Sequence, residues 1–341
     1  MLKTILLLIF TSTLLFSYVD LNKAWSEYKH RFIQKDGRVV DFKNGGITHT
    51  EGIGYALYFA YKMGDDATFK RIYKWGKENI KKNRYGLPGW KWGENKRNHR
   101  WGMIDYNSAS DANLWIVYSL LLMYEQTDYK PYKKDADKMI DAIKRNHIMH
   151  NSNLSFLLPW EKYIAEKYEW KINPSYFVFE IFEYLADYDG DKIWKELIKS
   201  SQIVLKHSRF SPLELNPDWT IYDLGKKQYI LHPDNTTFGY DAIRIPLFVI
   251  RSDLSREKKL ELLRPYRDYV EMMINKPLGV VDLKKGTISL YDISFGHIAI
   301  YMRISEYFNL DTSLFRKKLN NRMKKDHDDY YSYSLYLLSI L

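Results

Sequence analysis

The chain has 341 residues, of which 45% are hydrophobic and 28% are charged, a balance typical of a globular protein and not of a disordered or fibrous one. It contains no cysteine, which excludes disulfide frameworks, zinc–thiolate sites and thiol nucleophiles. The net charge is +10, but basic and acidic residues are interspersed and no nucleic-acid recognition motif accompanies them, so we expect a soluble basic surface and no nucleic-acid partner.

Residues 1–17 have the pattern of a secretory signal peptide, in which Lys3 precedes an apolar stretch that polar residues follow. An uncleaved membrane anchor is the alternative interpretation. Polar residues at 11–13 interrupt the stretch, and it falls short of the about 20 apolar residues that span a bilayer. We therefore expect a periplasmic or secreted protein whose mature part is 18–341.

Helical periodicity extends over nearly all of 18–341, and strand-like alternation is scarce. No Pro/Ser/Gly-rich linker and no repeat of fixed period divides this part, so we expect a single domain. The boundaries set by Gly, Pro, Asn, Asp and Ser predict about twelve helices, at 21–32, 51–63, 67–82, 110–126, 130–147, 174–187, 190–206, 238–251, 254–274, 290–306, 311–322 and 329–340.

The longer gaps fall between alternate helices and contain unusual residues. The gap 33–50 includes Gly45-Gly46, the gap 83–109 is dense in tryptophan, and the gap 207–237 contains three prolines. Helices paired by short turns, with long aromatic loops gathered at one end, indicate a closed ring of α-hairpins in which the loops build a cleft. The predicted fold class is therefore all-α.

Three carboxylates lie near the starts of predicted helices. Glu51 and Asp111 each follow a hydroxyl residue that can cap a helix, and Asp241 lies three residues before Arg244 on the same helical face. Each carboxylate also has a purely structural interpretation. A first-turn acid is stabilised by the helix dipole, and an acid and a base three residues apart form an ordinary ion pair. These segments alone leave both interpretations open.

The absence of several motifs excludes some classes of catalytic chemistry, and aromatic residues in the loops indicate a class of ligand. The sequence has no Gly-rich phosphate loop, no paired metal-binding histidine motif and no G-x-S-x-G elbow. We expect no cofactor and no metal, which leaves acid–base chemistry by carboxylates. Aromatic faces stack on sugar rings, although any one tryptophan can serve packing instead. Six tryptophans lie in or beside the predicted loops: Trp90, Trp92, Trp101, Trp160, Trp170 and Trp219.

Seven short motifs occur in order along the chain: GGITHTEG (45–52), LPGWKWG (87–93), DYNSASDANLW (105–115), LLPW (157–160), WKINPSY (170–176), NPDW (216–219) and GYDAIR (239–244). Together, from about Trp25 to the C-terminus, they resemble the family 8 glycoside hydrolases, and within that family the cellulases encoded beside bacterial cellulose synthases. The resemblance implies an (α/α)6 barrel, inversion at the anomeric carbon and an open cleft for β-1,4-glucan.

By position, the resemblance implies that Glu51 is the proton donor, Asp241 the base that activates water, and Asp111 the acid that contacts the sugar at the scissile bond. An inverting hydrolase holds its acid and base about 6.5–9.5 Å apart. Because Glu51 and Asp241 lie far apart in sequence, only a closed fold brings them together. We expect Asp111 to raise the pKa of Glu51 by like-charge repulsion, and Arg244 to keep Asp241 ionised.

Four further residues are implied to bind substrate. The resemblance places Tyr240 and Arg244 around the base, Tyr176 near the attacking water, and Trp90 as a platform on which a sugar stacks. One departure is Asn113, where the family often has an aspartate. This asparagine removes a charge from the segment after SASD.

The expected protein is a secreted, inverting endo-β-1,4-glucanase that acts as a monomer on β-1,4-glucan, in loose association with a cellulose synthase complex. Hydrolases of xylan, mixed-linkage glucan or chitosan share the scaffold, and a cationic chitosan chain is the least compatible with a net charge of +10. A glycan-binding accessory protein without catalysis and a polysaccharide lyase on a similar helical toroid are the alternatives from other classes.

Overall fold

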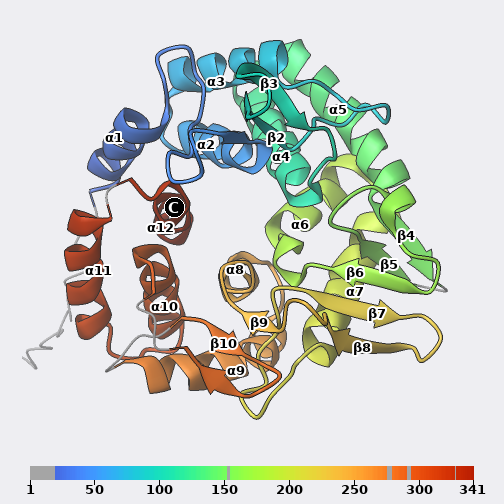
Figure 1. The fold of residues 1–341 in the computed structure, drawn as a ribbon, viewed down its shortest axis with the longest axis vertical. Coiled ribbons are helices and arrows are strands. Elements are labelled where there is room, and N and C mark those ends of the chain that lie inside the picture. Colours follow the sequence, from blue (N-terminus) through green and yellow to red (C-terminus); the bar gives the residue numbers. More distant parts are fainter. Residues whose placement is uncertain (1–19, 152–153, 275–278, 290–292, 327) are drawn as a thin grey trace, which may run out of the picture.

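The computed structural model describes residues 20–151, 154–274, 279–289, 293–326 and 328–341 (Figure 1). The predicted signal peptide at 1–17 lies outside the described residues. Within the described ranges, no helix is both long enough and apolar enough to cross a membrane.

The twelve α-helices of the described residues form two concentric rings (Figure 1). The inner ring consists of α2 (Thr50–Lys62), α4 (Ser110–Thr127), α6 (Phe179–Asp189), α8 (Arg244–Arg251), α10 (Phe295–Tyr307) and α12 (Tyr330–Ile340). The outer ring consists of α1 (Leu21–Phe32), α3 (Asp66–Asn79), α5 (Lys130–Asn146), α7 (Lys192–His207), α9 (Arg256–Met273) and α11 (Ser313–Lys325).

Contacts between neighbouring helices close the inner ring. Each inner helix contacts the next along the chain, and α12 returns to contact α2. Each outer helix packs on an inner one: α1 on α12, α3 on α2, α5 on α4, α7 on α6, α9 on α8, and α11 on α10. This arrangement is an (α/α)6 barrel and confirms the predicted all-α fold class.

The sequence of each helix matches its place in the two rings. Outer helix α5 buries one stripe of residues at helical spacing, including Tyr132, Ala136 and Ile143, and turns its lysines outward. Inner helix α12 has the sequence YYSYSLYLLSI and is buried on nearly all sides. A helix that is apolar all round must lie between other helices, so the sequence separates inner from outer positions.

Two inner helices approach closely because one of them carries a glycine at the crossing. A Cβ added to Gly54 of α2 would lie 2.7 Å from Cβ of Trp115 in α4, and the Trp115 side chain is fully buried. The indole packs edge-on against Tyr55 and Tyr58 of α2. The α2–α4 interface therefore depends on the missing side chain at position 54.

The long connections before the inner helices contain short antiparallel strands, which the sequence analysis did not predict. Alternation is undetectable in elements of two to six residues. The strands are β1 (Thr48–His49), β2 (Lys91–Asn95) and β3 (Arg100–Asp105) in one sheet, β4 (Ile148–Asn151) and β5 (Leu154–Leu157) in a second, β6 (Glu169–Ile172), β7 (Thr220–Asp223) and β8 (Gln228–Leu231) in a third, and β9 (Thr237–Phe238), β10 (Val281–Asp282) and β11 (Thr287–Ile288) in a fourth.

The predicted helix 290–306 begins only at Phe295 as α10, and residues 290–292 lie outside the described residues. Two helix starts that lie wholly within the described residues were also predicted too early. Residues 174–176 form a 3-10 turn because the Asn173 side chain accepts the Ser175 N–H at 3.0 Å, and α6 begins only at Phe179. Residues 239–243 form a turn in which a distant carboxylate, Asp218, accepts the backbone N–H groups of Gly239, Asp241 and Ala242. Helix α8 therefore begins only at Arg244.

The glycine at the α2–α4 crossing can be tested against a second helical glycine. We expect Gly54→Ala to lower the free energy of unfolding by about 1–3 kcal/mol, because the added methyl group overpacks the crossing. The matched control is Gly76→Ala in α3, where an added Cβ has no neighbour closer than 3.9 Å. That change should instead stabilise the helix by about 0.5–1 kcal/mol. Urea denaturation followed by circular dichroism measures both. Equal effects at the two positions would contradict the close packing at Gly54.

Candidate active site

Three carboxylates and one arginine meet at the N-terminal ends of inner helices. Glu51 is the second residue of α2, Asp111 is the second residue of α4, and Arg244 is the first residue of α8. Asp241 lies in the turn that leads into α8. The ring of helices thus brings together four residues that three separate sequence segments supply.

Arg244 stands at the centre of this group. Its side chain is 2% exposed, and Nη1 bonds to Oε1 of Glu51 and lies 3.4 Å from Oδ2 of Asp111. Nη2 bonds to Oδ1 of Asp241 at 2.9 Å. The sequence suggested an ion pair between Asp241 and Arg244 alone, whereas the structure shows one guanidinium joining three carboxylates.

Two hydroxyl groups hold the guanidinium and Glu51 in place. The Tyr55 hydroxyl donates to Oε1 of Glu51 at 3.1 Å and accepts from Nη1 of Arg244 at 3.2 Å. Nη2 of Arg244 also bonds to Oγ of Ser175 at 2.8 Å. Because the guanidinium is planar, these bonds fix its orientation as well as its position.

Asp241 is held on one side and open on the other. Its Oδ1 faces Arg244, and its Oδ2 accepts from Nδ2 of Asn173 at 3.1 Å. About a third of the side chain, 34%, remains exposed. The carboxylate is therefore oriented by the protein and accessible to solvent at the same time.

Asp218 fixes the turn that carries Asp241, and the sequence analysis assigned it no role. Its Oδ1 accepts the N–H groups of Gly239, Asp241 and Ala242 at 3.0, 3.1 and 2.7 Å. Its Oδ2 accepts from the Thr237 hydroxyl at 2.8 Å. The only signal in the sequence was the NPDW motif, since no local spacing relates position 218 to position 241.

Burial perturbs the pKa values of these carboxyl groups. Burial, and next the charge of Glu51, raise the pKa of Asp111 to about 8 against the opposing charge of Arg244. Burial also raises the pKa of Asp241, although Arg244 and Asn173 favour its ionised form. Arg244 is the second-largest influence on Asp241 and favours its ionised form, as the sequence analysis expected of it, while burial acts in the opposite direction. Burial and the charge of Asp241 raise the pKa of Asp218 to about 6.

The other predicted binding residues, Tyr176, Tyr240 and Trp90, differ in what they contact near the carboxylate group. The ring of Tyr176 lies 5.6 Å from Cζ of Arg244, and burial raises the tyrosine pKa well above its usual value. The ring of Tyr240 is 55% exposed and packs edge-on against His297. The carbonyl of Trp90 accepts the Thr50 N–H at 3.0 Å, immediately before Glu51. Tyr176 therefore joins the carboxylate group directly, and Trp90 adjoins the start of α2.

The loop tryptophans divide into two kinds. Trp160 and Trp219 stack with ring centroids 5.4 Å apart, and both remain half-buried. Trp92 and Trp101 lie 5.4 Å apart beside the Arg38 guanidinium, with half of Trp101 exposed. In contrast, a further tryptophan expected among the loop residues, Trp170, is 5% exposed and packs on Phe156 and Tyr222.

Asn113 occupies a fully buried position that suits a neutral side chain. Its Nδ2 lies 3.3 Å from Nε2 of His147, which also contacts the Ser108 hydroxyl at 2.8 Å. Burial lowers the pKa of His147 to about 4, so the imidazole is neutral near pH 7. Residues two apart on a helix do not share a face. An aspartate at position 113 would therefore not face the group formed by Glu51, Asp111, Asp241 and Arg244.

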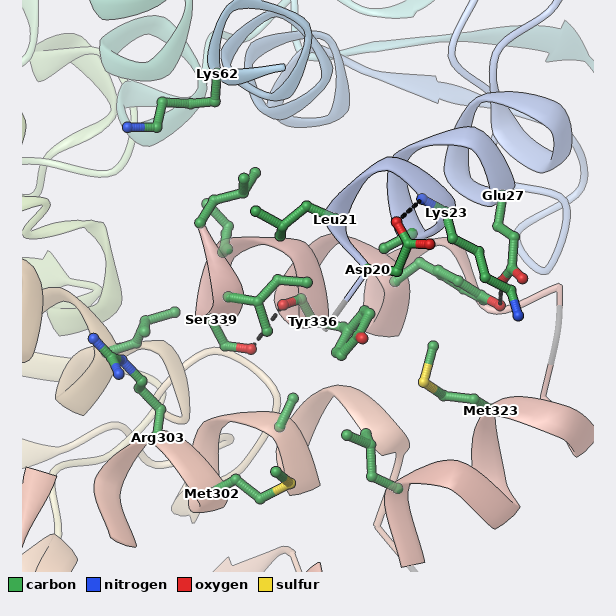
Figure 2. A pocket seen from close by; sticks show the side chains of 18 of the residues that line it. Asp20, Leu21, Lys23, Glu27, Lys62, Met302, Arg303, Met323, Tyr336 and Ser339 are labelled. Carbon is green, nitrogen blue, oxygen red and sulfur yellow. Dashed lines mark hydrogen bonds between the residues drawn. The ribbon is translucent and has the colours of Figure 1, made fainter. Parts of the chain in front are cut away.

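A pocket of about 980 Å³ lies at the other end of the barrel, near the C-terminal ends of the inner helices (Figure 2). Its lining includes Lys62 at the end of α2, Arg251 at the end of α8 and Arg303 in α10. Neither Glu51 nor any other member of the carboxylate group lines it. The volume of a cavity therefore does not by itself indicate where the carboxylate group lies.

Comparisons with known proteins agree on one family. The chain matches the family described as "Glycosyl hydrolases family 8" over residues 3–341. An endoglucanase of Xanthomonas axonopodis pv. citri (strain 306) is 30% identical over 269 residues, which is 77% of this chain and 69% of that protein. An endoglucanase of Escherichia coli O157:H7 is 30% identical over 255 residues, which is 73% of this chain and 68% of that protein.

Solved structures show the same architecture. The endo-1,4-D-glucanase of Vibrio fischeri ES114 superposes with a TM-score of 0.84 at 26% identity and covers 93% of each chain. The endo-β-1,4-glucanase CMCax of Acetobacter xylinum superposes with a TM-score of 0.82 at 25% identity, over 94% of this chain and 96% of that chain. Each superposition covers more than nine-tenths of both chains compared, so the fold is shared.

The raised pKa of Asp111 predicts a pH-dependent difference in stability. An unfolded aspartate ionises near pH 4, whereas folded Asp111 keeps its proton up to about pH 8. Unfolding of the native chain then releases a proton between about pH 4 and pH 8, and its free energy of unfolding falls as the pH rises through that window. Asp111→Asn lacks this titration. Relative to the native chain, its free energy of unfolding should rise by at most ~1.4 kcal/mol per pH unit there.

Denaturation curves at a series of pH values measure this difference for Asp111→Asn, and Asp135→Asn on the outer ring is the control. The pKa of Asp135 is lowered despite burial, by bonds from Tyr73 and Lys77, so the sign of its pH dependence should be opposite and its window should lie below about pH 4. A difference for Asp111→Asn that does not vary between pH 4 and pH 8 would contradict the raised pKa.

Proposed function

This chain belongs to family 8 of the glycosyl hydrolases, and we propose that it cleaves β-1,4-glucan within the chain by inverting acid–base hydrolysis. The family confirms the resemblance inferred from the seven motifs, and with it the prediction of a glycoside hydrolase acting as an endoglucanase on a β-glucan polysaccharide. The observation that carries the proposed mechanism is the bonding of Glu51, Asp111 and Asp241 to one buried arginine.

The spacing of two of these carboxylates supports the proposed roles. Glu51 and Asp241 bond to different terminal nitrogens of Arg244, so one guanidinium group and two hydrogen bonds separate their oxygens. An inverting hydrolase needs room between its two carboxyl groups for a sugar ring and a water molecule, roughly 6.5–9.5 Å. Glu51 and Asp241 are held apart by the guanidinium and are not paired with each other, as two groups with separate acid and base roles require.

In the proposed reaction, Asp241 accepts a proton from a water molecule whose oxygen attacks the anomeric carbon. Glu51 donates its proton to the glycosidic oxygen on the opposite face, so the bond from that oxygen to the anomeric carbon breaks and the configuration inverts. The exposed part of Asp241 gives water access to the base, and Asn173 and Arg244 orient it. Both carboxyl groups return to their starting protonation by exchange with solvent.

Asp111 has a different proposed role because it is protonated near neutral pH. A neutral carboxyl group donates a hydrogen bond, so Asp111 would bind a sugar oxygen as a donor. Its protonation also leaves one negative charge fewer beside Glu51 and Arg244.

We also retain as proposals the export of the protein through residues 1–17 and its action as a monomer near a cellulose synthase complex. The basis for export is the signal-like composition of the N-terminus. The basis for the association is the resemblance of the motifs to cellulases encoded beside cellulose synthases. Mass spectrometry of the mature N-terminus from a periplasmic extract would test the first of these.

The roles of the acid and the base can be tested by isosteric substitution. We expect Glu51→Gln and Asp241→Asn each to lower kcat on hydroxyethylcellulose by about 10²–10⁴-fold, because each removes one proton transfer. Reducing-end assays measure the rate, and thermal unfolding checks that the fold persists. Proton NMR of the first anomer released by the native enzyme should show the α form. Retained activity in Glu51→Gln, or initial release of the β anomer, would refute the mechanism.

The turn held by Asp218 yields a second test of the same site. We expect Asp218→Ala to lower kcat by about 100-fold, because loss of the bonds to Gly239, Asp241 and Ala242 displaces the base. Asp218→Asn keeps an acceptor oxygen and should retain more activity than the alanine variant. If Asp218→Ala keeps kcat within twofold, the turn does not position the base.

A further inference from the structure

Two exposed tyrosines and one half-buried tyrosine, Tyr85, lie on the loops around the start of α4, outside the carboxylate group. The rings of Tyr85 and Tyr163 stack with centroids 5.3 Å apart, and the Arg84 guanidinium lies 4.8 and 4.9 Å from them. Tyr163 and Tyr106 are each 54% exposed. We call Arg84, Tyr85, Tyr106 and Tyr163 the tyrosine platform.

The loops that carry the platform are held by specific hydrogen bonds. The Asn83 side chain accepts the N–H groups of Tyr85 and Leu87 at 3.0 and 3.2 Å, which closes a tight turn ending at Gly86. Nδ2 of Asn83 also bonds to the Tyr106 carbonyl and to the buried Glu161 side chain. The platform rings therefore project from an ordered support and lose little freedom when they bind a ligand.

A short series of contacts connects the platform to the proposed acid. The Tyr163 hydroxyl donates to Oδ1 of Asn107 at 3.1 Å, and the Asn107 carbonyl accepts the Trp90 N–H at 2.7 Å. The Trp90 carbonyl in turn accepts the N–H of Thr50, which directly precedes Glu51. The platform is thus continuous with the structure that holds the acid, and a polymer bound at the acid can extend towards it.

We propose that the tyrosine platform binds glucose units of the glucan chain beyond the bond that is cleaved, an inference that rests on the proposed function. The exposed parts of Tyr106 and Tyr163 offer apolar surface to the apolar faces of glucose rings, and the tyrosine hydroxyls and the Arg84 guanidinium, which lies over the stacked rings, can bond to sugar hydroxyls. A neutral chain fits this surface because much of it is aromatic. The platform therefore favours long chains over short oligosaccharides.

The test compares a polymer with a short substrate. In Tyr85→Ala/Tyr163→Ala, the ratio of kcat/KM on hydroxyethylcellulose to kcat/KM on cellopentaose should fall about tenfold, through a higher KM for the polymer. Affinity electrophoresis in hydroxyethylcellulose, with Glu51→Gln added to prevent hydrolysis, should show a loss of binding of the same size. Tyr85→Phe/Tyr163→Phe keeps both rings and should restore the ratio to within twofold.

The control is Tyr129→Ala, which removes an equally exposed tyrosine between α4 and α5, at the other end of the barrel. An unchanged ratio in the platform variant, or a loss equal to that of Tyr129→Ala, overturns the proposal. An equal loss on cellopentaose also overturns it, because the platform would then act inside the catalytic site. If Arg84→Gln alone abolishes binding, and only to carboxymethylcellulose at low salt, the partner is an anionic polymer instead.

The same data separate the platform from the proposed function. A native protein that binds hydroxyethylcellulose through the platform but releases no reducing ends would refute hydrolysis and leave the platform standing. A native protein that hydrolyses both substrates, with no selective loss in the platform variant, would refute the platform and leave hydrolysis standing.

Discussion

The structure depends on keeping three carboxylates together at one place, and Arg244 is the group that makes this possible. Like charges in a buried site repel strongly unless a cation or a proton intervenes. The guanidinium contacts Glu51, Asp111 and Asp241 and offsets part of their negative charge. Because the pKa of Asp111 is raised to about 8, a proton on this group also lowers the repulsion near neutral pH. Removing the cation would leave buried carboxylates uncompensated, a change that typically costs about 3–5 kcal/mol.

The ring of helices supplies the geometry that this charge arrangement requires. Inner helices α2, α4 and α8 place their N-terminal ends at the same end of the barrel, and each contributes one member of the group. The close α2–α4 crossing at Gly54 brings together the two helices whose first turns carry Glu51 and Asp111. The Asp218 carboxylate holds the turn before α8, so the base is positioned by a residue that itself needs no contact with substrate.

Most of the helical architecture was predictable from the sequence because burial repeats at helical spacing. The outer helices show one apolar stripe and the inner helices are apolar nearly all round, so the number of helices and most of their ends followed from pattern and capping residues. The two late helix starts were not predictable. Asn173 acts through a local turn that resembles a helix start, and Asp218 acts on a segment more than twenty positions away.

The sequence by itself determined the family, the twelve-helix ring and the identity of the candidate acids, because motifs and periodicity are local properties of the chain. Only the tertiary structure decided that Arg244 joins Glu51, Asp111 and Asp241, and that burial raises the pKa of Asp111 to about 8. It also decided that Trp170 serves packing while Tyr163, stacked on the half-buried Tyr85, is exposed. Burial and electrostatic coupling depend on distances between segments remote in sequence, and closure of the ring sets those distances.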